Sequence, residues 1–149
     1  MMLFPEYLNS QDGSAIVLSV KPRFANLIVA GSKRVEFRRA VPARPVRTIA
    51  LYSSSPVQAI IALVDVKKTI EANTAGLWEL AKENGGGLTR AELRSYFTSK
   101  TTGFAFMLGN VRVFKQPVDP SEFFDVFTPP QSFKYLTDDE LRELKNIQE

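Results

Sequence analysis

The stretch "GSKRVEFRR", residues 31–39, is the part of the sequence from which the fold can be inferred. Four of its nine residues are cations, and Glu36 is its one acid. Apolar Val35 and Phe37 alternate with charged side chains between Arg34 and Arg38, which is the period of a half-buried strand with a charged outer face. Such a pattern is typical either of a solvated surface strand or of the rim of a site that holds an anion.

The charge around this stretch is unevenly distributed. Residues 21–47 contain eight cations and one acid, whereas the whole chain has a net charge of only +3. A basic block on an otherwise balanced protein indicates a surface for a polyanion, although a solvated face gives the same pattern.

The composition restricts the chemistry that the chain can perform. The 149 residues contain no cysteine and no histidine. Their absence excludes a thiolate nucleophile, a cysteine-bound zinc and a Ser-His triad, so any reaction must use Lys, Glu, Asp, Tyr, Ser, Thr or Arg. We expect no cofactor and no metal ion.

The apolar runs are too short to cross a membrane. The longest is residues 59–64, and the first fourteen residues lack the basic and apolar regions of a signal peptide. We therefore expect a cytoplasmic protein without a membrane partner.

Several short strands are predicted outside the opening stretch. Apolar, β-branched runs place them at residues 15–20, 48–52 and 58–68, in addition to 34–38. Residues 102–114 form either two strands or one bent strand, with the break at Gly109 and Asn110.

Short helices are predicted between these strands. Pro22 suits the first turn of a helix and Gly31 its end. A second helix lies around residues 77–81 and is ended by three glycines. Capping boxes at Thr89 with Glu92 and at Thr137 with Glu140 begin two more helices.

These elements predict an α+β fold, a small mixed β-barrel of five or six strands with short flanking helices. No regular βαβ alternation is present, which argues against a doubly wound fold. We expect an N-terminal extension over residues 1–14, one domain over 15–136, and a C-terminal helix over 137–149 packed on that domain.

The sequence resembles the ASCH domain family. Its signature G-x-K-x-x-E-x-R is matched by Gly31, Lys33, Glu36 and Arg38. The helix before the signature, the strand after it and "PPQSFKYL" (residues 129–136) extend the resemblance over residues 15–136. The resemblance implies a PUA-like β-barrel with a basic cleft, which the matched Lys, Glu and Arg would line and residues 53–56 would border.

The resemblance also implies a function. ASCH domains are expected to bind RNA or modified nucleosides, in some cases as regulators of transcription or translation, and some small members are hydrolases. Members that remove the acetyl group of N4-acetylcytidine have a Thr nucleophile in place of the signature Glu. Because this chain has Glu36 there, the resemblance favours a ribonuclease over an amidohydrolase if the protein is an enzyme.

We therefore predict an RNA-binding or nucleoside-binding domain. Cations would contact phosphate, Glu36 would bind a base edge, and Tyr52 or Phe37 would offer a stacking face, although the apolar face of its strand favours a core position for Phe37. The predicted ligand-binding residues are Lys33, Arg34, Glu36, Arg38, Arg39, Tyr52, Ser53, Ser54 and Ser55.

Two alternatives remain open from the sequence. In a histidine-free ribonuclease or related hydrolase, Lys33 would act as a base, Glu36 or Tyr52 would take part in proton transfer, and Arg38 would stabilise charge on phosphorus. In a protein-interaction domain, the proline-rich loop over residues 117–130 and the acidic last helix would provide the contact surface.

Overall fold

The computed structural model describes residues 13–122, 124, 127–130 and 133–147. The elements in chain order are β1 (Ser14–Val20), α1 (Pro22–Val29), β2 (Val35–Arg38), β3 (Val46–Ser53), β4 (Ala59–Asn73), α2 (Thr74–Asn84), α3 (Arg90–Tyr96), β5 (Thr102–Val118), the 3-10 turn η2 (Pro120–Glu122), β6 (Phe133–Tyr135) and α4 (Asp138–Asn146). Residues 1–12 of the predicted N-terminal extension lie outside the described residues.

The six strands form one curved mixed sheet in the order β2-β5-β4-β3-β1-β6. β1 and β3 are parallel, and the other neighbours are antiparallel. This confirms the predicted α+β class with a mixed sheet of six strands. The sheet does not close into a full barrel in the described part of the chain, because the edge strands β2 and β6 have only four and three residues and each pairs with one neighbour.

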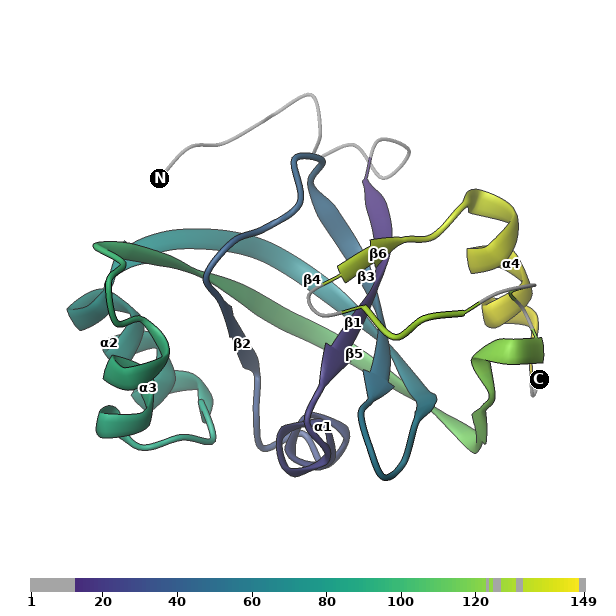
Figure 1. The fold of residues 1–149 in the computed structure, drawn as a ribbon, viewed down its shortest axis with the longest axis horizontal. Helices are drawn as coiled ribbons and strands as arrows, with labels where there is room; N and C mark the ends of the chain where they lie inside the picture. The colour runs from purple at the N-terminus through teal and green to yellow at the C-terminus, as the bar shows by residue number, and fades with distance from the viewer. Residues whose placement is uncertain (1–12, 123, 125–126, 131–132, 148–149) are drawn as a thin grey trace.

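The long strands β4 and β5 determine where the helices lie. The two strands cross most of the length of the molecule in Figure 1. The helices α2 and α3 lie at the left end of this pair and α4 lies on the right, while α1 lies below the end of β1. Of the two predictions for residues 102–114, the single strand is correct: β5 has 17 residues and passes through Gly109. The pairing of β5 with β4 shifts its register on either side of Val66. These β-bulges bend the strand opposite Gly109 and Asn110, where the sequence suggested a hairpin, without interrupting it.

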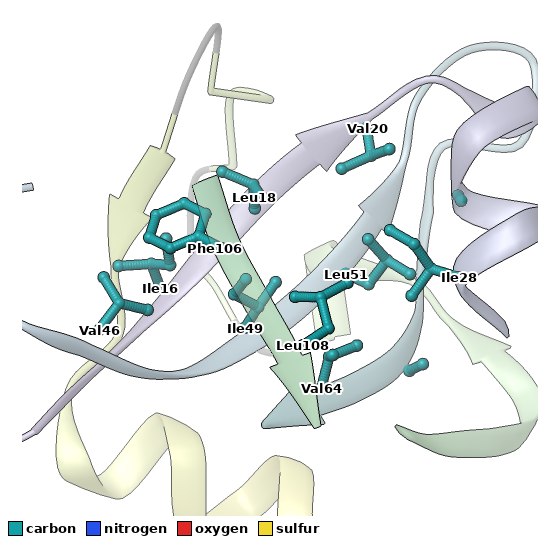
Figure 2. Close-up of a cluster of buried hydrophobic side chains, with 12 residues drawn as sticks. Ile16, Leu18, Val20, Ile28, Val46, Ile49, Leu51, Val64, Phe106 and Leu108 are labelled. Atoms are coloured by element: carbon teal, nitrogen blue, oxygen red, sulfur yellow. The ribbon is translucent and has the colours of Figure 1, made fainter. Parts of the chain in front are cut away.

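One hydrophobic cluster joins α1 to the sheet. Ile28 of α1, 2% exposed, belongs to the same buried cluster as side chains from β1, β3, β4 and β5. In Figure 2 Ile28 lies beside Leu51, and Phe106, which is 1% exposed, lies at the other side of the cluster near Ile16. No helix in residues 13–122 or 133–147 is both long and apolar enough to pass through a bilayer.

A separate cluster fixes α2 and α3 against β2. Val35 and Phe37 pack with Leu77 of α2 and Leu93 of α3, and Trp78 is partly buried at the edge of this cluster. Phe37 is 5% exposed, so its predicted core position is confirmed. Both predicted capping boxes, at the starts of α3 and α4, are present. The docking of α3 beside β2 forms one wall of the cavity described next.

Candidate functional site

A cavity of about 460 Å³ lies between β2, α1, α3 and the ends of β1 and β3. This volume is within the range of small-molecule sites. The charged side chains that line it are Lys21, Lys33, Arg38, Arg39, Glu36 and Glu92. Its apolar and aromatic walls are Val20, Phe24, Phe37, Leu88 and Tyr96. We call this cavity the β2 pocket.

Three charged groups of the signature meet at the base of the β2 pocket. Arg38 donates from Nε and Nη2 to Glu36 Oε2 at 3.1 and 2.7 Å. Lys33 Nζ lies 3.5 Å from Glu36 Oε1. The side chains of Lys33, Glu36 and Arg38 are only 2%, 9% and 12% exposed. The site is therefore a buried triad of two cations and one carboxylate.

Of the two interpretations of the strand, this burial argues against the solvated face. Arg34 does not join the triad, because it precedes β2 and its Nη2 donates to the Glu83 carbonyl at 3.4 Å. Lys33 lies beside Glu36 instead and is 3% exposed. Neighbouring α1 and α3 cover the charged face, which a periodic pattern on one strand does not reveal.

The triad retains hydrogen-bonding capacity for a ligand. Lys33 Nζ donates to the Gly86 carbonyl at 2.5 Å, and its ammonium has three donors. Arg38 Nη2 also donates to the Ser19 carbonyl at 2.9 Å, while within the described residues no partner is recorded for Arg38 Nη1. Glu36 Oε1, at the longer distance from Lys33, has lone pairs available.

Burial lowers the pKa of Lys33 below its ordinary value of 10.5. Glu36 opposes the shift by attraction and by hydrogen bonding, and Arg38 and Arg23 add to it by repulsion. The ammonium of Lys33 therefore loses its proton at a lower pH than that of an exposed lysine.

Glu92 joins α1 and α3 at the rim of the pocket. Its Oε2 accepts a hydrogen bond from Arg23 Nη2 at 2.8 Å, and its Oε1 accepts from the Thr89 N–H at 2.8 Å. The Thr89 N–H and Arg23 hold the pKa of this carboxyl below its usual range. Both carboxylate oxygens of Glu92 thus accept hydrogen bonds within the protein.

Three consecutive glycines after α2 position Lys33. The Arg34 N–H donates to the Asn84 carbonyl at 2.8 Å, and Gly86 supplies the acceptor for Lys33. A Cβ on Gly85 would lie 1.9 Å from the Ser32 carbonyl oxygen. The sequence predicted these glycines only as a helix end. The number of glycines could have indicated a further role, because the end of a helix requires only one glycine.

Gly87→Ala is expected to destabilise the protein more than Gly31→Ala. Both glycines have a left-handed φ, +81° and +83°, which costs an alanine about 1–2 kcal/mol. A Cβ at Gly87 would also lie 2.9 Å from Leu27 Cδ1, whereas nothing lies within 4 Å at Gly31. Urea unfolding of both variants measures the difference. Equal losses of stability in the two variants would show that the Leu27 side chain moves aside at no energetic cost.

The structure brings five of the predicted site residues together: Lys33, Glu36, Arg38, Arg39 and Ser54. The guanidinium carbon of Arg39 lies 4.7 Å from the centroid of the Tyr96 ring. Sequence reasoning did not identify the walls from α1 and α3, because no pattern along the chain shows that those helices face β2.

The other predicted residues lie outside the pocket lining. Arg34 and Ser55 are exposed, and Ser53 is fully buried with no hydrogen-bond partner for its hydroxyl among the described residues. Tyr52 is 3% exposed and its ring lies 5.4 Å from that of Phe127, in the cluster that packs on α4. Burial, with a contribution from Asp119, raises the pKa of Tyr52.

Comparison with known proteins relates this geometry to a family. The ASCH domain family model matches residues 18–113. An "ASCH domain-containing ribonuclease" of Zymomonas mobilis subsp. mobilis is 29% identical over 143 residues, which cover 91% of this chain and 93% of that protein. The crystal structure of ASCH from Zymomonas mobilis superimposes with a TM-score of 0.82 at 28% identity, covering 90% of this chain and 95% of that one. The N-terminal domain of Staphylothermus marinus McrB shares the fold alone, with a TM-score of 0.58 at 13% identity and coverage of 91% and 94%. The resemblance drawn from the signature is thereby confirmed, and the chain belongs to the ASCH domain family.

Proposed function

We propose that this protein binds single-stranded RNA and takes one nucleotide of the strand into the β2 pocket. The observation that carries this proposal is the buried triad of Lys33, Glu36 and Arg38 at the base of a cavity with aromatic walls. Guanidinium and ammonium groups suit phosphate, a carboxylate suits an exocyclic amine, and aromatic rings suit a base.

Each side chain has a role consistent with its contacts. Arg38 Nη1, which has no partner within the described part of the chain, and the remaining donor of Lys33 would bind phosphate oxygens, with the exposed Arg39 beside them. Glu36 Oε1 would accept from a base amine. Phe24 of α1 and Tyr96 of α3 line the pocket and would contact the base. The triad also favours an unpaired strand, because a base must leave its stack to reach groups that are so deeply buried.

The test is binding of a fluorescent RNA strand whose 2′ hydroxyls are methylated, so that cleavage cannot remove the probe. With three to five phosphate contacts, log affinity against log salt should fall with a slope of about −2 to −3.5. Arg39→Ala removes one exposed contact and should reduce the slope by about 0.7. Affinity that is independent of salt, or no binding at all, would contradict the proposal and leave the protein-interaction alternative. Equal affinity for a duplex would contradict the proposed binding of an unpaired nucleotide.

A second candidate function is cleavage of the bound strand. It is favoured by the name of the Zymomonas relative and by the lowered pKa of Lys33. Neutral Lys33 Nζ would accept the proton of a ribose 2′ hydroxyl as its oxygen bonds to the adjacent phosphorus. The bond from phosphorus to the 5′ oxygen would break, that oxygen would take a proton from water, and Arg38 would stabilise the charge on phosphorus.

A further inference from the structure

A second arginine–aromatic pair lies on the edge strand β6, outside the β2 pocket. The guanidinium carbon of Arg44 is 3.7 Å from the centroid of the Tyr135 ring. The Arg44 backbone N–H donates to the Tyr135 hydroxyl at 3.1 Å, and Phe133 meets the Tyr135 ring edge-on with centroids 5.3 Å apart. The exposed guanidinium of Arg44 is thus held over the ring rather than left free to rotate.

Arg44 and Arg39 share an uncommon environment. Both are exposed and held over aromatic rings, and neither forms an ion pair with an acid in the described part of the chain. Two other exposed arginines, Arg23 and Arg142, do pair with acids, Glu92 and Asp139 respectively. The charges of Arg39 and Arg44 are therefore not compensated locally and remain available to an external anion.

The two arginines lie on one connection. Arg39 follows β2 directly, and Arg44 comes five residues later, before β3. Residues 37–47 contain no acid, and a span of five residues reaches at most about 18 Å. Figure 1 shows this connection rising from the end of β2 to the edge of the molecule where β3 begins. An anionic chain that leaves the pocket at Arg39 would meet only cationic or apolar side chains along it.

We propose that the β2–β3 connection continues the RNA-binding surface, with Arg39 and Arg44 contacting successive phosphates and the Arg44–Tyr135 pair providing a platform for a second base. This proposal rests on the proposed function of the β2 pocket. A guanidinium plane and a tyrosine ring are both surfaces on which unpaired bases stack. The surface would be used only by a strand long enough to extend beyond the pocket.

The experiment compares Arg44→Ala with Arg142→Ala, which removes the same charge from an exposed ion pair on α4. The probes are a nucleoside monophosphate and a 2′-methylated RNA strand of about eight nucleotides. For the strand, Arg44→Ala should weaken binding about tenfold and reduce the salt slope by about 0.7, while Arg142→Ala changes neither. Both variants should bind the monophosphate as the unchanged protein does. Arg44→Lys should restore the salt slope but only part of the affinity, because lysine lacks the stacking plane.

Each remaining outcome has a distinct meaning. Equal strand affinity for Arg44→Ala and Arg142→Ala would overturn the inference, because the pair would then only anchor the connection. A loss of monophosphate binding in Arg44→Ala would also overturn it, since the effect would lie in the pocket. If Arg44→Ala has a lowered unfolding midpoint, the Arg44→Lys variant decides the question. Full strand affinity in Arg44→Lys would contradict the proposal that the Arg44–Tyr135 pair stacks with a base. If the unchanged protein binds neither probe, the proposed function itself fails.

Discussion

Replacing Glu36 with glutamine is expected to reduce the free energy of unfolding by about 3–5 kcal/mol at neutral pH. Among residues 13–122, 124, 127–130 and 133–147, Glu36 is the only carboxylate that pairs with Lys33 and Arg38, and the three side chains are 2–12% exposed. Glutamine has the same shape but no charge, so two buried cations would remain without a counter-ion. The loss comes from their desolvation rather than from a lost surface attraction.

The loss should shrink as pH rises. Burial already lowers the pKa of Lys33, and without Glu36 the attraction that opposes this shift is absent. Between the lowered pKa and 10.5 the unfolded chain binds more protons at Lys33 than the folded chain does, so the free energy of unfolding increases with pH in that window. Below the window the penalty of the buried ammonium is complete. Recovery at alkaline pH is partial, because Arg38 stays charged.

Urea unfolding across this pH range provides the measurement, with Asp139→Asn as the matched control. That change also removes one carboxylate from an arginine pair, but Arg142 and Asp139 are 67% and 85% exposed. Exposed pairs contribute about 0–1 kcal/mol. Similar losses for Glu36→Gln and Asp139→Asn would mean that the triad is effectively solvated and that its burial has been misjudged.

The sequence predicts the triad because the triad is local. Glu36 and Arg38 alternate on one strand, so their head groups share a face regardless of how the chain folds elsewhere. Lys33 is two residues before β2, and the signature identifies it even though its burial depends on α1 and α3. Phe24 and Tyr96 lie more than seventy positions apart in the chain, on α1 and α3. That both line one pocket is a property of packing, which no local sequence period contains.

Tyr52 is a predicted site residue that lies outside the pocket lining. An aromatic residue at the end of a strand beside a serine turn is a reasonable stacking candidate, yet its side chain packs with Phe127 beside α4. Tyr52 follows the regular alternation of β3, because it lies in the same buried cluster as Ala50, whereas Ile49 and Leu51 lie in the other. The period of the strand therefore groups these side chains correctly, but it does not show which face packs toward α4 and which faces the β2 pocket.

Lys33→Met is expected to leave the fold intact and to weaken RNA binding. In this variant Glu36 keeps both hydrogen bonds from Arg38. Lys33 Nζ lies 5.2 Å from the centroid of the Phe24 ring and 5.5 Å from that of Phe37, so a methionine side chain of similar length would lie near both rings. The large cost of breaking a buried ion pair comes from the uncompensated charge that remains. Removing one cation from a triad of two cations and one carboxylate leaves no such charge, because Arg38 and Glu36 stay paired. Glu36→Gln and Lys33→Met should thus differ in stability although each removes one charge of the same triad.

The two candidate functions respond to pH in opposite directions. If the Lys33 ammonium binds phosphate, RNA affinity falls as pH rises through its lowered pKa. If neutral Lys33 is a base, cleavage of unmodified RNA rises over the same range, and Lys33→Met should lower the rate by about 10²- to 10⁴-fold and remove this rise. A rate that rises with pH equally in the variant would exclude Lys33 as the base.

The measurement that tests the pocket most directly is the affinity of Lys33→Met for the 2′-methylated strand, taken together with its urea midpoint. Hydrogen bonds to a charged group contribute about 1.5–3 kcal/mol, so affinity should fall about 10- to 100-fold while the midpoint stays within the range of the unchanged protein. A variant that unfolds at the normal midpoint and still binds the strand as tightly as the unchanged protein would contradict the account, because RNA would then be held on some other surface.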